Sequence, residues 1–515
     1  MTTPASDAAF RTLPDLIGEH AQRQPRHPAL RDDRQTLSYA ELDALMNRIA
    51  AALQRDGVAP GQATAICADA SVRYAALFLG ALRAGVVVAP LAPSATADSL
   101  ASMLRDAGAR RLFTDAAARE RLPGAEHLPP CTALDDDAAF DRWLAPASTR
   151  PTPATIAPEA PFNIIYSSGT TGTPKGIVQS HGMRWAHIQR GATYGYGPQG
   201  STLLATPLYS NTTLVVFVPT LAYGGCVVLM KKFDALHYLE LAQRHRITHT
   251  MLVPVQYQRI MALPQFGQFD LSAFRYKFCT SAPFRAELKA DVLARWPGGL
   301  TEFYGMTEGG GTCILDAHAH PDKLHTVGKP AAGSDIRLID EDGRELPPGE
   351  AGEVVGHSPG MMTGYHGQPE KTREAEWFDA AGKRFIRTGD VGRFDADGFL
   401  TLFDRRKDMI ISGGFNIYPS DLEAVLRQHP AVHDVAVVGV PSEQWGETPV
   451  AFVVPNADAT ATAEQLKDWY NQRAGKTQRL TDLRWVNELP RSAIGKVLKR
   501  ELREAYAAGE PRSPS

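Results

Sequence analysis

The chain has 515 residues, of which 43% are hydrophobic and 22% are charged, and its formal net charge at pH 7 is −3. Single hydrophobic cores stop growing near ~250–300 residues, so we expect roughly two to four domains. The sequence contains no apolar run of about 18 residues, the length that would predict a membrane-spanning helix. The near-neutral charge, without a basic stripe, argues against a nucleic-acid partner.

The first part of the chain alternates helix and strand patterns. Apolar residues recur at helical spacing over 37–57 and 73–85, and short runs over 64–68 and 86–91 are typical of strands. Such alternation favours a mostly parallel sheet with helices against it. A segment rich in Pro, Ala and Thr, 146–161, then predicts an extended connector.

The alternation resumes after residue 161. A helix is expected at 236–246, and strands are expected at 163–168, 202–210, 226–233, 249–255, 276–282 and 300–305. The sequence therefore predicts a second doubly wound α/β layer.

The pattern changes between about 325 and 403, where short β runs are separated by the turn sequences DEDG and DADG. These turns indicate hairpins of an antiparallel barrel or sheet. After about residue 407 we expect a small α+β unit, with helices at 419–429 and 463–473, strands at 434–440 and 449–455, and a disordered tail from about Ala507.

The segment 166–176, YSSGTTGTPKG, consists almost wholly of glycine, hydroxyl residues and one lysine. Glycines allow the backbone to approach a ligand closely, hydroxyls donate hydrogen bonds, and Lys175 adds a positive charge, so the segment predicts a polyphosphate site. A P-loop is excluded by spacing, because Thr173 and Pro174 separate Gly172 from Lys175, and Gly176 replaces the required Ser or Thr. A mobile surface loop is the alternative.

Four later segments extend this observation: YGMTE (304–308), RTGDVG (387–392), DRRKDMIISGGFNIYPSDLE (404–423) and PRSAIGKVLK (490–499). Together with 166–176 they resemble, in order and over nearly the whole chain, the motifs of AMP-forming acyl-CoA synthetases, the adenylate-forming superfamily that includes firefly luciferase and peptide-synthetase adenylation domains. The resemblance implies an α/β fold with an N-terminal domain, 1–406, of two doubly wound subdomains and a β-barrel-like subdomain (about 1–160, 161–324 and 325–406). A small mobile α+β domain, 407–515, is expected to follow.

The same resemblance implies two half-reactions. A carboxylate attacks the α-phosphate of ATP to give an acyl-adenylate and pyrophosphate, and the thiol of CoA then displaces AMP. Lys496 matches the catalytic lysine that meets the carboxylate and the α-phosphate, and Glu308 matches a glutamate associated with Mg²⁺. Thr307 and Lys175 complete the expected catalytic set, and Thr170 is expected to join Glu308 at the metal. Without the resemblance, Lys496 could be a solvated charge near a helix end.

Further residues match positions that bind the nucleotide. The phosphates are expected on Ser167, Ser168, Gly169, Thr170, Thr171 and Gly172. Asp390 and Arg405 match ribose ligands, since an ionised carboxylate accepts from two vicinal hydroxyls. The adenine is expected against Ser281, Ala282, Pro283, Glu302, Tyr304 and Gly305, and Ser281 replaces a residue that is commonly glycine.

The C-terminal motifs imply a hinge and a CoA site. Lys407 matches the hinge, whose rotation would withdraw Lys496 from the site. CoA is expected along Gly413, Gly414, Trp445 and Arg479, although plain packing is the alternative role of Trp445. No motif contains a cysteine, so the thiol comes from CoA or from a free-standing carrier protein.

The acid pocket is expected at Tyr209, Ser210, Asn211, Val255 and Met306. Ser210 stands where many acyl-CoA synthetases carry His, and the segment has no Asp to pair an α-ammonium, which disfavours an α-amino acid. Trp185, His187 and Arg190 either shape the pocket or simply pack, and an exposed helix face is favoured. An arginine inside would indicate a second carboxylate or hydroxyl on the acid. The residues suit fatty, branched hydroxy or aryl acids.

We therefore expect a cytoplasmic acid:CoA ligase that uses ATP, Mg²⁺ and CoA. The alternatives are an acyl-AMP ligase that loads a free-standing carrier protein, and a non-catalytic nucleotide-binding sensor or scaffold, against which the intact Lys175, Glu308, Asp390 and Lys496 argue. Five cysteines without a C-x-x-C pair, and an N-terminus without a secretory or transit pattern, indicate a reduced compartment and no structural zinc. A homodimer is left open.

Overall fold

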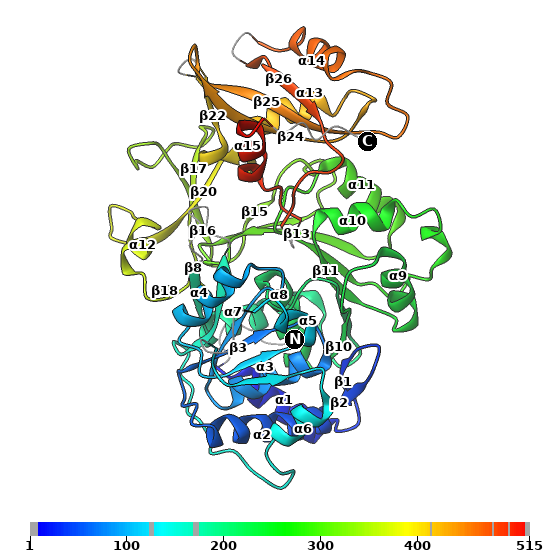
Figure 1. The fold of residues 1–515 in the computed structure, drawn as a ribbon, viewed down its shortest axis with the longest axis vertical. Helices are drawn as coiled ribbons and strands as arrows, with labels where there is room; N and C mark the ends of the chain where they lie inside the picture. The colour runs from blue at the N-terminus through cyan, green and yellow to red at the C-terminus, as the bar shows by residue number, and fades with distance from the viewer. Residues whose placement is uncertain are drawn as a thin grey trace. The chain divides into compact units, whose positions relative to one another are not determined.

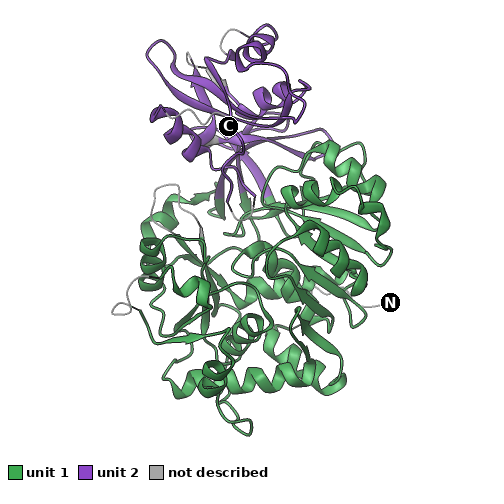
Figure 2. Ribbon diagram, turned by 45° about the vertical axis from the view of Figure 1, so that its right-hand side comes forward, with its two compact units in different colours: residues 1–335, 356–386 green, residues 336–355, 387–515 purple. Residues whose placement is uncertain are grey.

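The computed structural model describes residues 9–122, 128–167, 175–412, 415–475, 478–492 and 495–509. Its contacts divide the chain into two compact units. Unit 1 comprises residues 1–335 and 356–386, and unit 2 comprises residues 336–355 and 387–515 (Figure 2). Within the described ranges, no helix is both long and hydrophobic enough to cross a membrane.

The first sheet of unit 1 has seven strands in the order β18-β8-β7-β4-β3-β5-β6 (Figure 1). Strands β7 and β3 to β6 are parallel, whereas β8 and β18 are antiparallel to their neighbours. Ile66 and Val88 face one hydrophobic core and Ala65 and Ala89 another, as the alternation of side chains along strands buried on both faces requires. The strands are β3 (Ala63–Cys67), β4 (Val87–Pro90), β5 (Leu112–Thr114), β6 (Cys131–Ala133), β7 (Pro161–Ser167), β8 (Lys175–Ser180) and β18 (Gly364–Tyr365).

The second sheet of unit 1 has nine strands in the order β15-β14-β13-β12-β11-β9-β10-β1-β2. Its central strands β13, β12, β11, β9, β10 and β1 run parallel, and antiparallel strands close both ends. The strands are β1 (Pro28–Arg31), β2 (Thr36–Ser38), β9 (Ser201–Leu204), β10 (Cys226–Leu229), β11 (His249–Leu252), β12 (Tyr276–Cys279), β13 (Gly299–Gly305), β14 (Thr312–Asp316) and β15 (Lys329–Pro330). The predicted doubly wound α/β class is confirmed.

The helices of unit 1 begin where the sequence supplies caps. Ser38 Oγ accepts from the Glu41 backbone N–H and the Glu41 carboxylate accepts from the Ser38 N–H, which is a capping box at the start of α2. The helices are α1 (Leu13–Arg23), α2 (Tyr39–Arg55), α3 (Val72–Arg83), α4 (Ala97–Asp106), α5 (Ala116–Arg119), α6 (Asp137–Trp143), α7 (His181–Gly191), α8 (Asn211–Ala222), α9 (Ala235–Arg244), α10 (Pro254–Met261), α11 (Ala286–Arg295) and α12 (Pro369–Glu374), with 3-10 turns η3 (Ala192–Tyr194) and η4 (Phe266–Gln268).

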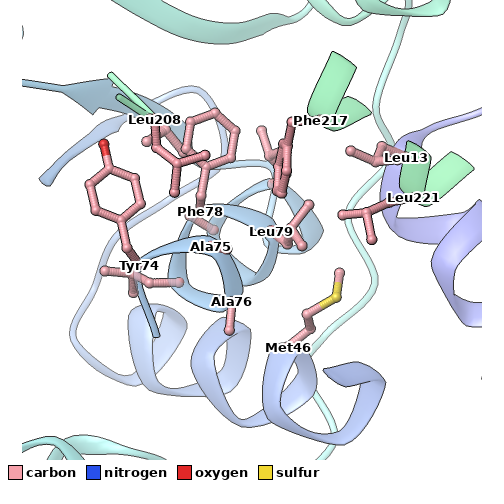
Figure 3. Packing of buried hydrophobic residues seen from close by; sticks show 14 of the residues in the cluster. Leu13, Met46, Tyr74, Ala75, Ala76, Phe78, Leu79, Leu208, Phe217 and Leu221 are labelled. Atoms are coloured by element: carbon pink, nitrogen blue, oxygen red, sulfur yellow. The ribbon is translucent and has the colours of Figure 1, made fainter. Parts of the chain in front are cut away.

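Helix α3 is buried on nearly every side, because side chains from several helices converge on it. Figure 3 shows Phe78 and Leu79 of α3 beside Phe217 of α8, with Met46 of α2 on another side. The Phe78 ring centroid lies 5.7 Å from that of Phe162 and 6.4 Å from that of Phe217. A helix that is hydrophobic all round is expected in the centre of a large core, and α3 fills this place.

A third sheet has the order β16-β17-β20-β19, with β21 paired to β20. The predicted DADG hairpin is confirmed, because β20 and β21 are antiparallel on either side of it and Gly398 has a φ of +81°. The unit boundaries fall within β16, β17 and β20. The strands are β16 (Asp335–Ile339), β17 (Gly352–His357), β19 (Glu376–Phe378), β20 (Arg384–Phe394) and β21 (Leu400–Arg405).

The C-terminal part of unit 2 contains the predicted α+β arrangement. Its sheet has the order β23-β22-β25-β24 with β26 paired to β25, and separate hydrophobic cores form from alternating residues of β24 and β25. The elements are η5 (Arg406–Asp408), β22 (Ile410–Ser412), β23 (Phe415–Ile417), α13 (Pro419–Leu426), β24 (Val432–Ser442), β25 (Gly446–Pro455), α14 (Ala463–Asn471), β26 (Asp482–Trp485) and α15 (Lys499–Ala507). Residues 510–515 of the predicted tail lie outside the described ranges.

Some predicted limits differ from the observed ones. The strand expected at 202–210 ends at Leu204, and the strand expected at 249–255 ends at Leu252, because α8 and α10 begin soon afterwards. The linear subdomain limits near 160 and 324 do not follow the sheets, since β1 and β2 join the second sheet and β7 and β8 join the first. The domain boundary at 406/407 stays a prediction, and the contacts place 336–355 and 387–406 in unit 2.

Candidate functional site

The predicted phosphate segment begins at the end of one strand and finishes at the start of the next. β7 and β8 are antiparallel, and Ser167 pairs with Lys175. Lys175 is therefore held by a strand ladder at the first position of β8. Other predicted phosphate ligands lie outside the described residues, as does the side chain of Ser167: they are Ser168, Gly169, Thr170, Thr171 and Gly172.

Tyr365 of β18 lies between two predicted site residues, Lys175 and Glu308. Its hydroxyl donates to Glu308 Oε1 over 2.9 Å, and Lys175 Nζ lies 5.0 Å from the centroid of its ring. Burial and the charge of Glu308 raise the pKa of Tyr365, so the hydroxyl stays protonated and donates. The backbone oxygen of Glu308 also accepts from the Met362 N–H over 2.7 Å. Lys175, Glu308 and Tyr365 form the cluster that we call the carboxylate cluster.

Replacing Tyr365 with phenylalanine should slow the first half-reaction. Phenylalanine keeps the ring beside Lys175 but removes the hydrogen bond to Glu308, and a hydrogen bond to a charged group contributes about 1.5–3 kcal/mol. We expect acid-dependent pyrophosphate release to fall by about tenfold or more, with a higher Mg²⁺ concentration needed for half-maximal rate. Tyr39→Phe is the control, since it removes a 2.7 Å hydrogen bond to Gly225 O in the buried core. Equal rates in Tyr365→Phe and the control would contradict the positioning role.

A second polar group of unit 1 surrounds Arg184 on α7, which is 1% exposed. Its guanidinium donates to Asn163 Oδ1 (3.0 Å), to Asn211 Oδ1 (2.9 Å) and to Gln179 Oε1. Gln179 in turn donates to the backbone oxygen of Thr307 over 2.7 Å. Burial lowers the pKa of Arg184 to about 9, so the group stays charged at neutral pH. The network links two predicted site residues to the buried Arg184, Asn211 directly and Thr307 through Gln179.

The predicted adenine turn follows β12 and has an unusual backbone. Ser281 has a φ of +82°, in the left-handed region that favours glycine, which accounts for the glycine expected at this position. Its Oγ lies 2.7 Å from Thr212 Oγ1, and this hydrogen bond ties the turn to the start of α8. Ala282 is half-buried and Pro283 is exposed. The turn is thus anchored on one side and open on the other.

Glu302 lies on β13, and its side chain forms an ion pair with Lys289. Its carboxylate lies 2.5 Å from Lys289 Nζ, and the two side chains are 5% and 1% exposed. Lys289 Nζ also donates to the backbone oxygens of Leu324 (2.7 Å) and Thr326 (3.0 Å). A buried cation already pairs with this carboxylate. The adenine contact expected for Glu302 stays a prediction, and the ion pair does not favour it.

Tyr304 and Gly305 end the same strand. They lie opposite Cys313 and Thr312 of β14, and the side chain of Tyr304 is half-buried. The strand therefore brings Tyr304 and Gly305 to one end of the nine-stranded sheet, directly before Thr307 and Glu308 in the chain.

In unit 2, the two predicted ribose ligands are direct neighbours. Asp390 of β20 and Arg405 of β21 occupy opposite positions of the antiparallel ladder, and Arg405 Nε lies 3.2 Å from Asp390 Oδ1. The Asp390 N–H donates to Thr388 Oγ1 over 3.0 Å. A carboxylate beside a guanidinium donor is a pair of groups that suits two vicinal hydroxyls.

Lys496 lies in a tight turn of unit 2. Its N–H donates to Ser492 Oγ (3.2 Å), the Ser492 N–H donates to its carbonyl (2.8 Å), and Gly495 has a φ of +77°. Burial lowers the pKa of Lys496 to about 8, with further lowering from Arg405 and an opposing effect of Asp390. Lys496 is thus electrostatically coupled to the Asp390 and Arg405 pair within unit 2.

The predicted hinge residue Lys407 is an exposed residue of η5, and its neighbours are held by ion pairs. Arg503 Nη2 of α15 lies 3.0 Å from Asp408 Oδ1. Lys499 Nζ lies 3.8 Å from Asp404 Oδ2 and 3.2 Å from a Glu423 oxygen, and these carboxylates raise the pKa of Lys499 against the effect of burial. These contacts connect α15, which directly follows the Lys496 turn, to the segment around the predicted hinge.

The predicted CoA residues are only partly described. Gly413 and Gly414 lie outside the described residues, between β22 and β23. Trp445 lies in the turn between β24 and β25, where its N–H donates to Ser442 Oγ over 3.3 Å, and it is half-buried. Arg479 is exposed. No described contact joins Trp445 to Arg479, so the CoA path stays a prediction.

A small cavity of about 20 Å³, enough for roughly one water molecule, lies in unit 1 against α7 and α8. His187 and Arg190 line it and are half-buried, although an exposed helix face was favoured. Its other lining residues are Gly191, Tyr194, Tyr196, Val215, Val216, Pro219, Phe278 and Phe303. Trp185, by contrast, packs against the main core and meets Phe10 edge-on at 6.3 Å. We call this space the ring cavity.

The residues predicted for the acid pocket lie elsewhere in unit 1. Ser210 is the N-cap of α8, its Oγ accepting from the Thr212 N–H over 3.3 Å, and so it has a structural role where many family members have His. Asn211 binds Arg184, Met306 packs near Tyr365, and Tyr209 and Val255 are half-buried. None of the five lines the ring cavity. Their assignment to the acid stays a prediction.

Family models match most of the chain. The model described as "AMP-binding enzyme" matches residues 17–366, and the one described as "AMP-binding enzyme C-terminal domain" matches residues 421–496. The chain belongs to the AMP-binding enzyme family. The family resemblance read from the motifs is confirmed.

Relatives of this AMP-binding enzyme align over nearly its whole length. A feruloyl-CoA synthase of an Amycolatopsis species is 34% identical, covering 94% of this chain and 97% of the relative. The fatty acid–[acyl-carrier-protein] ligase ScoC of Streptomyces coeruleorubidus is 32% identical, covering 96% and 97%. Among solved structures, ATP-bound MatB from Rhodopseudomonas palustris superposes with a TM-score of 0.86 at 29% identity, covering 96% and 99%.

The donor set of this AMP-binding enzyme fits Mg²⁺. The ion accepts few protein ligands and keeps several waters, so one carboxylate with substrate phosphate oxygens is enough to hold it. Glu308 accepts one hydrogen bond from Tyr365 and retains further lone pairs, while Thr170 lies outside the described residues. Elsewhere in the described ranges, no three His, Cys, Asp or Glu side chains gather as a metal site.

Three residues of this AMP-binding enzyme were not singled out from the sequence. Tyr365 orients Glu308, Arg184 holds Asn211 and Gln179, and Lys289 pairs with Glu302. Each is a single residue outside the recognised motifs, and Tyr365 and Arg184 meet Glu308 and Asn211 across 57 and 27 residues of the chain. Only the fold brings these pairs together, so no spacing in the chain could have indicated them.

Proposed function

We propose that the chain is an ATP-dependent acid:CoA ligase, which forms an acyl-adenylate and then an acyl-CoA. The observation that carries this proposal is the arrangement in unit 2, where Lys496 is coupled to the paired Asp390 and Arg405. A cation beside a hydroxyl-binding carboxylate suits a reaction in which an organic acid meets a nucleoside phosphate. The full-length similarity to a CoA synthase supports the same assignment.

In the first half-reaction, the proposed role of Lys496 is to neutralise charge as the carboxylate approaches the α-phosphate. Lys175 and Glu308 would act on the phosphates, Glu308 by holding Mg²⁺, which supplies further neutralisation of the triphosphate. Tyr365 would keep the Glu308 carboxylate in place through its hydrogen bond. Asp390 and Arg405 would bind the ribose.

In the second half-reaction, the thiol of CoA would attack the acyl carbon and release AMP. We propose that the segment around Lys407 is the hinge for the change between the two halves, and that Gly413, Gly414, Trp445 and Arg479 serve CoA. The exposed position of Lys407 next to an ion-paired Asp408 is consistent with a short hinge beside a rigid element. We propose a cytoplasmic location, where ATP and CoA are both available, and a homodimer stays a prediction.

A carrier protein is the second candidate acceptor of the acyl group. One observation favours it: the ScoC relative, 32% identical over nearly the full length, is named as a ligase of fatty acids to an acyl carrier protein. The two functions share the first half-reaction and differ only in the thiol.

A pyrophosphate-release screen tests the proposal. The full chain is incubated with ATP, Mg²⁺ and a panel of fatty, branched hydroxy, aryl and dicarboxylic acids, and the product is then identified with CoA or with a phosphopantetheinylated carrier protein. We expect pyrophosphate and AMP to appear with a subset of acids, and the acyl-CoA to form when CoA is added. Acyl transfer to the carrier alone would favour the second candidate. Absence of pyrophosphate with every acid would contradict both and indicate a non-catalytic nucleotide-binding protein.

A further inference from the structure

The side chain of Asp106 contacts both strands that carry the ends of the predicted phosphate segment. Tyr166, the first residue of that segment, lies on β7 opposite Gly176 of β8, which is its last residue. The Tyr166 hydroxyl donates to Asp106 Oδ2 over 2.7 Å, and the backbone oxygen of Met103 lies 3.1 Å from the same hydroxyl. Burial raises the pKa of Tyr166 and the Asp106 carboxylate raises it further, so the hydroxyl stays protonated and donates. Asp106 therefore holds the first end of the segment.

Gly176 leaves the space that lets Asp106 come close to β8. A Cβ atom at this position would lie 3.0 Å from Asp106 Oδ2 and 2.9 Å from Ile164 Cγ2. The backbone oxygen of Gly176 accepts from the His366 N–H over 2.7 Å, and His366 Nδ1 lies 3.7 Å from Asp106 Oδ2. Lys175 directly precedes Gly176, so a shift of Gly176 would move the cation that is predicted to bind the phosphates.

The position of Asp106 in its own helix is electrostatically unfavourable. Asp106 is the last residue of α4, and the carbonyl groups at the C-terminal end of a helix carry partial negative charge. The helix itself is fixed, because Leu100 and Leu104 pack in the same hydrophobic core as Ile164 of β7. The carboxylate therefore does not stabilise α4, and it connects a fixed helix to the two strand ends.

We propose that Asp106 is a positioning residue for triphosphate binding, which holds the ends of β7 and β8 and thereby the Lys175 ammonium in place. The inference rests on the proposed acid:CoA ligase function and adds to it a residue that lies outside every recognised motif. A site whose groups are already in place binds its ligand without first ordering them, so loss of the contact should weaken ATP binding. AMP lacks the two terminal phosphates, so its binding should not change.

The test compares the binding of ATP and of AMP to the full chain by calorimetry, with Mg²⁺ present and the acid left out, so that no turnover is needed. Tyr166→Phe keeps the ring and removes the hydroxyl, and Asp106→Ala removes the carboxylate. We expect each variant to bind ATP about tenfold more weakly than the parent protein, and AMP within about twofold of it. The KM for ATP should rise in the same proportion, whereas the KM for the acid should stay unchanged.

Further variants show whether the two residues act together. In Tyr166→Phe/Asp106→Ala, ATP binding should be no weaker than in Asp106→Ala alone, because both changes remove the same hydrogen bond. Asp106→Asn keeps an oxygen that can accept from the Tyr166 hydroxyl, so it should retain most of the ATP affinity. Tyr39→Phe is the control, since it removes a buried hydrogen bond in a different hydrophobic core. The thermal unfolding of each variant is compared with that of the parent protein.

The outcomes separate this inference from the ligase function. If Asp106→Ala bound ATP as tightly as the parent protein, or lost ATP and AMP affinity equally, the inference would be overturned and the ligase function would stand. Additive losses in the double variant would show that Asp106 does not act through Tyr166, which would also overturn it. Absence of pyrophosphate release with every acid would contradict the ligase function, and the ATP and AMP affinities would then decide the inference alone. A parent protein that did not bind ATP would overturn both.

Discussion

Replacing Lys496 with alanine should reduce adenylate formation by roughly 100- to 1000-fold, the size of effect seen when one donor to a developing negative charge is removed. Thioester formation from supplied acyl-AMP should remain largely intact, because the ammonium is needed only while the carboxylate approaches phosphorus. The half-buried setting of Lys496, which lowers its pKa to about 8, makes its charge count for more than that of an exposed lysine.

The two half-reactions are measured separately, by pyrophosphate release and by CoA-dependent AMP release from acyl-AMP. Arg500→Ala is the matched control, since Arg500 follows in the same segment and its pair with Glu504 leaves it 60% exposed. Since the pKa of Lys496 is about 8, the adenylation rate of the parent protein should also fall as the pH rises through 8. Equal loss in both half-reactions would contradict the assigned role.

Breaking the ion pair between Glu302 and Lys289 should destabilise unit 1 by about 3–5 kcal/mol, because the remaining partner becomes an uncompensated buried charge. Lys289→Met should have the larger effect, since the ammonium also serves the carbonyls of Leu324 and Thr326. In Glu302→Gln the amide oxygen can still accept a hydrogen bond from the Lys289 ammonium, so the loss of unfolding free energy should lie near the lower end of this range. The free energy of unfolding is measured in urea, with tryptophan fluorescence as the signal.

Two comparisons make this test specific. Asp291→Asn breaks an exposed pair with Arg295 on the same helix, α11, and should cost less than about 1 kcal/mol. The double variant Glu302→Leu/Lys289→Met should be more stable than the sum of the single effects predicts, because it leaves no unpaired charge. If the Glu302 and Lys289 single variants lost as little free energy of unfolding as Asp291→Asn, the buried ion pair would not contribute the expected stability.

The local pattern of the sequence was sufficient to predict the α/β class. Helices such as α2 and α3 begin within two residues of the predicted limits, because amphipathic spacing and side-chain caps are local signals. The sheet to which a strand belongs is a long-range property. β1 and β7 look like ordinary apolar strands, and only their packing assigns β1 to the second sheet and β7 to the first.

Several predicted strands were too long, and for the strands expected at 202–210 and 249–255 the chain did contain the signals for the correct ends. Ser210 is an N-cap residue before α8, and Pro254 occupies the first position of α10. The apolar residues around them suggested continuous strands. Helix start signals should therefore outweigh an apolar run of this length.

The site was predictable where residues lie in motifs. Asp390 and Arg405 were assigned to the same ribose from separate motifs, and the ladder of β20 and β21 places them opposite each other. The acid pocket was not predictable in the same way, because no motif records which side chains of the helices and strands turn inward. An exposed helix face was favoured for His187 and Arg190, but both are half-buried and line a small cavity.

The way the second sheet is assembled has a consequence for synthesis on the ribosome. β1 pairs with β2 on one side and with β10 on the other, and β10 lies about 200 residues later in the chain. At roughly 5–20 residues per second, the ribosome makes β10 about 10–40 s after β1. During that interval Ala29 and Leu30, both fully buried in the finished protein, belong to an unpaired strand edge. Chains that terminate before Cys226 should therefore aggregate or be retained by chaperones, whereas chains released after Leu229 can close the edge themselves.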